Sequence, residues 1–250
     1  MKTEWNYTEL AEAYLQRPDY AKDAVDAMLD FMQIPDNARV CDVGAGVAHL
    51  TKLLAQRGYF VDAVEPNDRM RELGTMQTKS FEKVNWYEGT GENTGRTSTA
   101  YDLVSFGSSF NVTDRLLTLA ETRRILKPGG WFACMWNHRD LEDPIQKGIE
   151  KIISEAIPGY DYGTRRENQR DFLEQSGYFE QVFEGEGRIV HQQSLHDCLT
   201  AWRSHATLQR QAKENFEQVI AAIENYLKSQ VETTLEIPYI TRIWYGQIMV

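Results

Sequence analysis

Residues suited to binding a nucleotide-like cofactor lie close together in the first third of the sequence. Asp42 stands inside a short apolar run, and Gly44 and Gly46 follow it at alternate positions. Glycines directly after a buried strand let the backbone approach a ligand closely, and a helix that follows offers free N–H groups. Glu65 ends the next apolar run, about twenty residues further on. A carboxylate at that point can accept hydrogen bonds from both hydroxyl groups of a ribose.

These residues favour S-adenosylmethionine over a dinucleotide. Dinucleotide-binding proteins use the pattern G-x-G-x-x-G, whereas the sixth position here is His49. Asp42 would repel a pyrophosphate and suits a ligand that carries an ammonium and a sulfonium group. Glu65 does not separate the two ligands, because both contain a ribose. An NAD-dependent dehydrogenase is therefore the less favoured alternative, and a non-catalytic sensor or scaffold for an adenosyl ligand also stays open.

The elements that must position these residues follow from the spacing of apolar side chains. Strand-like runs occur at 39–43, 59–64, 84–87, 101–106 and 131–136, and helical spacing occurs at 19–33, 49–56, 67–76 and 113–126. Strands that alternate with helices predict an α/β fold with a Rossmann-like, doubly wound, mostly parallel sheet. Such sheets bind ligands at the carboxyl ends of their strands, where the glycine turn and Glu65 are expected.

The rest of the chain predicts helices added to a seven-stranded sheet. We expect a single domain over 1–250, with a cap formed by N-terminal helices within 1–35 and inserted helices at about 144–178 and 194–230. Short strands at 179–183 and 188–190 are expected around a turn at Gly185-Glu186-Gly187, and 240–248 is expected to end the sheet. Lys127-Pro-Gly-Gly130 is expected to form the turn before the fifth strand.

Composition excludes several other classes of protein. Hydrophobic residues make up 42% of the chain and charged residues 26%, which is typical of globular domains. No run of 18 apolar residues and no apolar N-terminal segment is present, so neither a membrane span nor a secretory signal is expected. The net charge of −10 argues against nucleic acid or an anionic membrane as a partner. The three cysteines lack metal-ligand spacing, which predicts no metal site and a reduced, cytoplasmic location.

Several motifs resemble the class I S-adenosylmethionine-dependent methyltransferases. The likeness rests on Asp42-Val-Gly-Ala-Gly46 and Val64-Glu-Pro-Asn67, while Ala13-Tyr14 with Arg17-Pro-Asp-Tyr20 and Trp136-Asn-His-Arg-Asp140 resemble the ubiquinone-biosynthesis and trans-aconitate methyltransferase-like branch. The resemblance implies S-adenosylmethionine as cofactor and a small-molecule methyl acceptor. Tyr14 and Arg17 would then close over the cofactor carboxylate. The other implied cofactor-binding residues are Asp42, Gly44, Gly46, Glu65, Pro66, Asn67, Met70, Gly91, Glu92 and Phe106.

Two residues are candidates for the chemistry itself. His138 follows the fifth predicted strand and has an imidazole suited to proton transfer, although it can equally be an exposed or capping histidine. Asn111 follows the fourth predicted strand and can orient an acceptor, or else cap the following helix. Arg165 and Arg166 can grip a carboxylate, although a solvated charge pair is the commoner role for such residues. We expect methyl transfer to an oxygen or a nitrogen, with the oligomeric state and the acceptor open.

Overall fold

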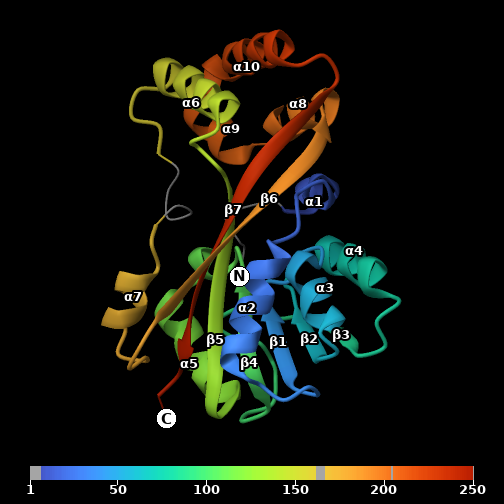
Figure 1. The fold of residues 1–250 in the computed structure, drawn as a ribbon, viewed down its shortest axis with the longest axis vertical. Coiled ribbons are helices and arrows are strands. Elements are labelled where there is room, and N and C mark those ends of the chain that lie inside the picture. The colour runs from blue at the N-terminus through green and yellow to red at the C-terminus, as the bar shows by residue number, and fades with distance from the viewer. Residues whose placement is uncertain (1–6, 162–166, 204, 250) are drawn as a thin grey trace. The chain divides into compact units, whose positions relative to one another are not determined.

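The computed structural model describes residues 7–161, 167–203 and 205–249, which form two compact units (Figure 1). The first unit contains the described residues up to Asn137 together with 167–187 and 241–249, and the second contains those of 138–161 and 188–240. Three strands contribute residues to both units: β5 (Leu126–Arg139), β6 (Phe183–Ser194) and β7 (Thr234–Gln247). The expectation that the chain forms one domain with a cap stays a prediction.

A seven-stranded sheet organises the first unit, in the order β3-β2-β1-β4-β5-β7-β6. Its first strands are β1 (Arg39–Val43), β2 (Phe60–Val64), β3 (Val84–Tyr87) and β4 (Tyr101–Gly107). These strands and the adjoining part of β5 pair in parallel, within a sheet that is mixed as a whole. The chain proceeds outward from β1 to β3 and then returns to place β4 on the other side of β1. The mostly parallel Rossmann-like sheet is thus confirmed, and its switch in strand order lies between β1 and β4.

Helices cover both faces of this sheet. Successive side chains of a strand point to opposite faces, so apolar residues next to one another in β5 contact different helices. Phe132 of β5 packs with Leu119 of α5 (Arg115–Ile125) and Leu173 of α7 (Arg170–Gln175). The preceding Trp131 instead contacts Phe31 of α2 (Lys22–Met32), with ring centres 6.1 Å apart. The remaining helices of this unit are α1 (Tyr7–Leu15), α3 (His49–Gln56) and α4 (Asp68–Thr78), together with the 3-10 turn η1 (Phe110–Val112).

The second unit is mainly helical and has its own apolar core. Its helices are α6 (Pro144–Ala156), α8 (Leu195–Arg203), α9 (Ala206–Ala212) and α10 (Phe216–Gln230), with the 3-10 turn η3 (Lys213–Asn215) before α10. Side chains from all four helices and from β7 fill the core, among them Ile149, Trp202, Leu208, Ile223 and Leu235. Among the described residues of 194–230, where helices were expected, the structure has α8, α9 and α10, and those of 144–178 contain α6 and α7.

The predicted turn at Gly185-Glu186-Gly187 is wrong. Residues 183–194 form one continuous strand, and neither glycine has a positive φ. Gly187 has a packing role, because a Cβ atom there would lie 2.6 Å from the Cβ of Ala24 on α2. The glycine permits close approach of helix and strand, which a local sequence pattern cannot distinguish from a turn.

The segment Lys127–Gly130 also differs from its prediction. It belongs to β5, which already begins at Leu126 opposite Tyr101. Between this pair and the next, Leu103 with Trp131, the register shifts, and Gly129 has a φ of +75°. The Pro-Gly-Gly sequence therefore forms an irregularity within a strand, of the kind that glycine makes accessible.

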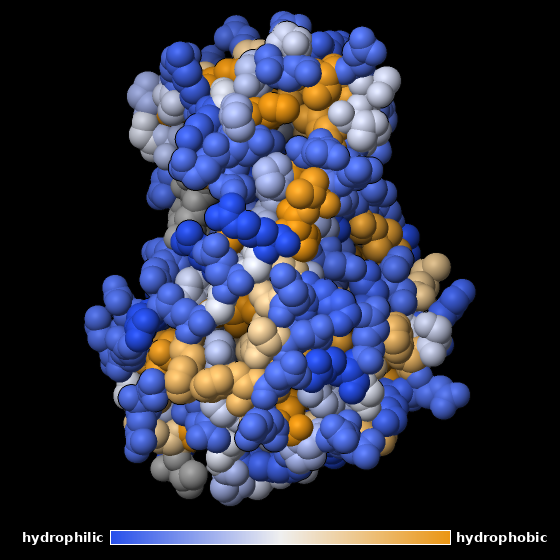
Figure 2. All heavy atoms as spheres, in the orientation of Figure 1, coloured by the Kyte–Doolittle hydropathy of each residue, from blue (hydrophilic) through white to orange (hydrophobic). Residues whose placement is uncertain are grey.

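The surface of the molecule agrees with its composition. Figure 2 shows hydrophilic residues over most of the visible face, with hydrophobic residues interspersed among them. Such scattered apolar residues are normal on protein surfaces. Among the residues that the structure describes, no helix combines the length and the apolar character that crossing a membrane would require.

Candidate functional site

A tight turn follows β1 and brings the backbone of β1 and β2 together. Its residues Gly44, Gly46 and Ala48 have φ angles of +67°, +57° and +82°. The N–H groups of Gly44 and Ala45 both donate to the carbonyl of Val64, at 2.8 and 3.1 Å. Three left-handed positions within five residues explain the glycines, and Ala48 shows that the third position keeps a glycine-like conformation without one.

Glu65 connects this turn to the start of α4. Its Oε2 accepts a hydrogen bond from the N–H of Gly46 at 2.9 Å, and its Oε1 accepts one from the N–H of Asn67 at 2.9 Å. Burial raises the pKa of Glu65, although these two hydrogen bonds and the charge of Arg71 oppose that effect. Each carboxylate oxygen has more than one acceptor position, so the group can still accept from a ligand. The structure thus brings Gly46, Glu65 and Asn67 together.

Asp42 lies behind the turn and is completely buried. Its Oδ2 accepts from the hydroxyl of Thr51 on α3 at 2.6 Å, and its Oδ1 accepts from the hydroxyl of Ser105 on β4 at 3.2 Å. The carboxylate therefore ties α3 and β4 to β1. Neither hydroxyl was identified from the sequence, although a carboxylate in a buried strand requires donors nearby.

The protonation of Asp42 should affect stability in weakly acidic solution. Burial raises the pKa of Asp42 from its ordinary 3.8 to about 6, because the two hydroxyl hydrogen bonds only partly offset desolvation. Between these pH values the folded state holds a proton that the unfolded state releases. The free energy of unfolding should therefore fall as pH rises through this window, by roughly 3 kcal/mol at most, and stay level above it.

The variant Asp42→Asn should lack this decline, because the amide does not ionise. Denaturant unfolding of both proteins from pH 4 to 7 checks the prediction through the difference between their curves. Parallel curves would show that Asp42 does not titrate in this range.

His49 anchors the segment that follows α1. Its Nε2 lies 2.8 Å from the carbonyl oxygen of Tyr14, and its Nδ1 lies 2.7 Å from Oδ1 of Asp19. Burial favours protonation of Asp19, but hydrogen bonds from His49 and Lys52 outweigh it and hold the pKa of that carboxyl below its usual value. Both ring nitrogens of His49 therefore contact oxygen atoms of the segment that follows α1. The guanidinium of Arg17 lies 3.6 Å above the ring of Tyr14.

Replacing His49 should increase local opening of the chain that follows α1. His49→Ala removes the contact with the Asp19 carboxylate, of a kind worth about 1.5–3 kcal/mol, and the contact with the Tyr14 carbonyl, of a kind worth about 0.5–1.5 kcal/mol. Hydrogen exchange of the Gln16 and Arg17 amides should accelerate by about 10–100-fold. Lys52→Ala is the matched control, because Lys52 contacts Asp19 from the same helix but does not bond the Tyr14 carbonyl. Unchanged exchange in His49→Ala would mean that the segment is held by other contacts.

The remaining residues predicted around the cofactor fall into different environments. Asn67 caps α4, since its side chain accepts from the N–H of Met70 at 3.0 Å, and Pro66 beside it is exposed. Met70 is buried in a small cluster against which Tyr14 packs. Gly91 is buried, and the carboxylate of Glu92 accepts from the N–H of Asp114 at the start of α5.

Phe106, which is predicted to bind the cofactor, has its side chain in the core of the first unit. Its side chain is fully buried, with its ring centre 5.4 Å from that of Phe110 and 5.5 Å from that of Phe132. The ring thus belongs to the core beneath α5, and only its backbone lies along the carboxyl end of β4. A strand presents alternate residues to opposite faces, and the sequence does not show which face a ligand meets.

The two candidate chemical residues belong to different units. Asn111 lies half-buried in η1 of the first unit, and His138 lies half-buried in β5 within the second. Their roles stay predictions. Arg165 and Arg166 lie outside the described residues.

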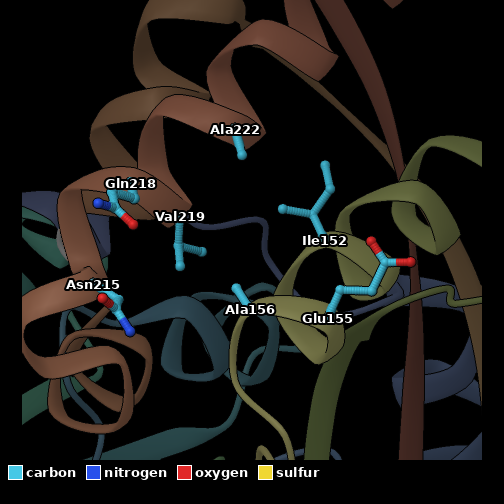
Figure 3. Close-up of a pocket in the computed structure, with 7 residues that line it drawn as sticks. All are labelled: Ile152, Glu155, Ala156, Asn215, Gln218, Val219 and Ala222. Atoms are coloured by element: carbon cyan, nitrogen blue, oxygen red, sulfur yellow. The ribbon is translucent and has the colours of Figure 1, made fainter.

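A groove of about 400 Å³ lies between α6 and α10 in the second unit. Figure 3 shows Ile152, Glu155 and Ala156 on one side of it and side chains of α10 on the other. None of the residues predicted to bind cofactor or acceptor lines this groove.

Several known proteins that are similar to this chain are named as methyltransferases. Residues 41–134 match the family described as a methyltransferase domain. An uncharacterized methyltransferase of Mycobacterium tuberculosis is 34% identical over 125 residues, or 50% of this chain and 48% of that protein. Demethylmenaquinone methyltransferase of Staphylococcus saprophyticus is 30% identical over 42% of this chain and 46% of that protein. The chain thus spans about half the length of these curated relatives.

Solved structures share the fold. YcgJ protein of Bacillus subtilis has a TM-score of 0.54 and 16% identity, and covers 90% of this chain and 97% of its own. A Haemonchus contortus phosphoethanolamine N-methyltransferase 2, in complex with S-adenosylhomocysteine, has a TM-score of 0.55 and 12% identity over 97% of this chain and 58% of its own. The predicted likeness to methyltransferases is thus confirmed for residues 41–134.

Proposed function

We propose that the protein transfers a methyl group from S-adenosylmethionine to an oxygen or nitrogen of a small-molecule acceptor, because residues 41–134 match a methyltransferase domain. The observation that carries this proposal is the Glu65 carboxylate held against the N–H of Gly46 in the left-handed turn. A Cβ atom on Gly46 would meet no other atom within 4 Å, so the turn faces open space. The solved relative in complex with S-adenosylhomocysteine adds support for the cofactor.

Charge also favours this cofactor. Asp42 and Glu65 are two buried carboxylates whose pKa values burial raises. A cationic ligand would relieve this cost, whereas a pyrophosphate would increase it. The ribose hydroxyls would donate hydrogen bonds to Glu65, and the amino acid portion of the cofactor would approach the turn. Tyr14 and Arg17 would cover that amino acid portion. The backbone at Gly91 and Glu92 would meet the adenine.

Little covalent help is needed for this reaction. The bound cofactor would supply a methyl group already activated by a positively charged sulfur. The protein would align the acceptor in line and exclude water. An acceptor that is protonated at working pH also needs a base, and we assign that role to His138, with Asn111 orienting the acceptor.

Calorimetric titration of the purified protein tests the cofactor. S-Adenosylmethionine and S-adenosylhomocysteine should compete for one site and raise the melting temperature by mass action. NAD should not bind. Binding of NAD without S-adenosylmethionine would overturn the proposal, and tight cofactor binding without turnover across a broad panel of phenols, amines and carboxylates would favour a sensor.

The role of His138 can be separated from cofactor binding once an acceptor is known. His138→Ala should lower kcat while the dissociation constant of the cofactor stays unchanged. The wild-type rate should rise with pH through a histidine-like titration, and the variant should lose that limb. A raised KM with an unchanged pH profile would instead make His138 an orienting residue.

A further inference from the structure

Arg139 is a cationic residue of the second unit that has no role in the proposed function. It belongs to the motif Trp136-Asn-His-Arg-Asp140. The guanidinium carbon of Arg139 lies 4.2 Å from the ring centre of Trp202 on α8. Its Nε lies 3.4 Å from the hydroxyl oxygen of Tyr239 on β7 and donates to it. Arg139 itself is half-buried. An indole and a phenol therefore fix the guanidinium without covering it completely.

No carboxylate among the described residues forms an ion pair with Arg139. Glu150 acts on it electrostatically, but the two side chains are not in ion-pair contact. The neighbouring Asp140 is already engaged, since its Oδ2 accepts from Arg188 at 3.0 Å and its Oδ1 from the N–H of Glu142 at 3.0 Å. The two Nη groups of Arg139 make no hydrogen bond within the described part of the chain.

The indole N–H of Trp202 is a second hydrogen-bond donor without an acceptor among the described residues. The residue is 4% exposed. Buried N–H groups nearly always have a partner, because leaving one unpaired costs stability. The ring of His205 stacks on the same indole, with centres 5.4 Å apart and planes at 21°. Within the described part of the chain, a fixed cation and a buried donor in contact with each other therefore both lack an anionic partner.

We propose that Arg139, Trp202 and Tyr239 form a binding site for a carboxylate group. The guanidinium fork matches the two oxygens of a carboxylate, and the indole supplies a further donor. Arg139 then gives the second unit a place to bind a carboxylate, within a protein whose net charge of −10 otherwise repels anions.

A carboxylate fits this site better than a phosphate. One guanidinium supplies a single positive charge, and Glu150 opposes any further negative charge nearby. The flat rings of Trp202 and Tyr239 suit a planar group attached to an apolar body. A dianionic phosphate would call for additional cations, whereas the groups that fix Arg139 in the described part of the chain are two neutral rings.

Nuclear magnetic resonance of the indole N–H groups tests the site on the whole chain without cofactor. The probes are benzoate, its neutral isostere benzamide, and inorganic phosphate. The six tryptophans give separate signals, and Trp202→Phe identifies that of Trp202. Benzoate should shift this signal with a roughly millimolar dissociation constant. Benzamide and phosphate should bind at least about tenfold more weakly.

Variants of Arg139 test whether its guanidinium group produces the preference for a carboxylate. In Arg139→Gln the preference for benzoate over benzamide should disappear, and Arg139→Lys should bind benzoate more weakly than the wild type because it lacks the fork. Arg203→Gln is the matched control, because Arg203 is an exposed arginine on α8 that pairs with Glu224. It should bind benzoate like the wild type. Ligand-observed relaxation measures the same affinities without any tryptophan assignment.

Equal binding of benzoate and benzamide, preferential binding of phosphate, or equal losses in Arg139→Gln and Arg203→Gln would each overturn the proposal. Arg139→Gln should still bind S-adenosylmethionine with wild-type affinity. Absence of cofactor binding by the wild type would overturn the proposed function alone, so the two failures are distinguishable.

Discussion

Replacing Glu65 with alanine is expected to weaken binding of S-adenosylmethionine by about 10²–10⁴-fold. The carboxylate would lose hydrogen bonds from two ribose hydroxyls, each worth about 1.5–3 kcal/mol when one partner is charged. It also holds the N–H groups of Gly46 and Asn67, so the turn would lose an anchor. Isothermal titration of the variant against the wild type measures the change.

Two further variants separate ribose binding from general effects. Glu65→Gln keeps the shape but offers one acceptor oxygen, so we expect an intermediate loss of about 10–100-fold. Glu72→Gln removes a negative charge from an exposed pair with Arg69 on the neighbouring helix and should leave the affinity unchanged. If Glu65→Ala bound the cofactor normally, Glu65 would not be part of the site.

The variant Gly46→Ala should impair cofactor binding far more than folding. An added methyl group would face the open space where the cofactor is expected, and overpacking of this kind costs about 1–3 kcal/mol. The dissociation constant should therefore rise by about 10–100-fold. Its left-handed φ of +57° adds a backbone cost of about 1–2 kcal/mol.

Gly58→Ala is the matched control, because Gly58 has a φ of +84° and open space where a methyl group would be added, but lies at the other end of α3. It should lose similar stability and no cofactor affinity. Gly44→Ala should be more destabilising than either, since its Cβ would lie 2.4 Å from the Cβ of Ser109. Melting temperatures without ligand, compared with titrations, distinguish these effects. Equal affinities for Gly46→Ala and Gly58→Ala would place the cofactor elsewhere.

Local patterns predicted the first unit well. Helix α3 begins at His49 and ends at Gln56 as expected, and β1 and β3 have their expected bounds. In these segments a single amphipathic run is bounded by glycine or proline, so nearby residues determine the element. The order of Asp42, Gly44 and Glu65 along adjacent strands then places the turn and the carboxylate at the same edge of the sheet.

Features that depend on distant residues could not be predicted. The role of Gly187 depends on Ala24, which lies far away in sequence, and the setting of Phe106 depends on which face α5 covers. His49 was a lone residue in the sequence, and its function appears only with the Tyr14 carbonyl and Asp19 around it. Likewise, the hydroxyl partners of Asp42 could not be predicted, because Thr51 and Ser105 come from two other elements.

The position of β7 in the sheet has a consequence for how the chain folds during synthesis. β7 lies between β5 and β6 although it is the last of the three to leave the ribosome. Until it emerges, β6 has no neighbour in the sheet and β5 keeps an open edge, which are conditions that invite pairing with other chains. The cofactor turn between β1 and β2 can therefore form early, whereas the sheet that supports it is completed only after translation has passed residue 247.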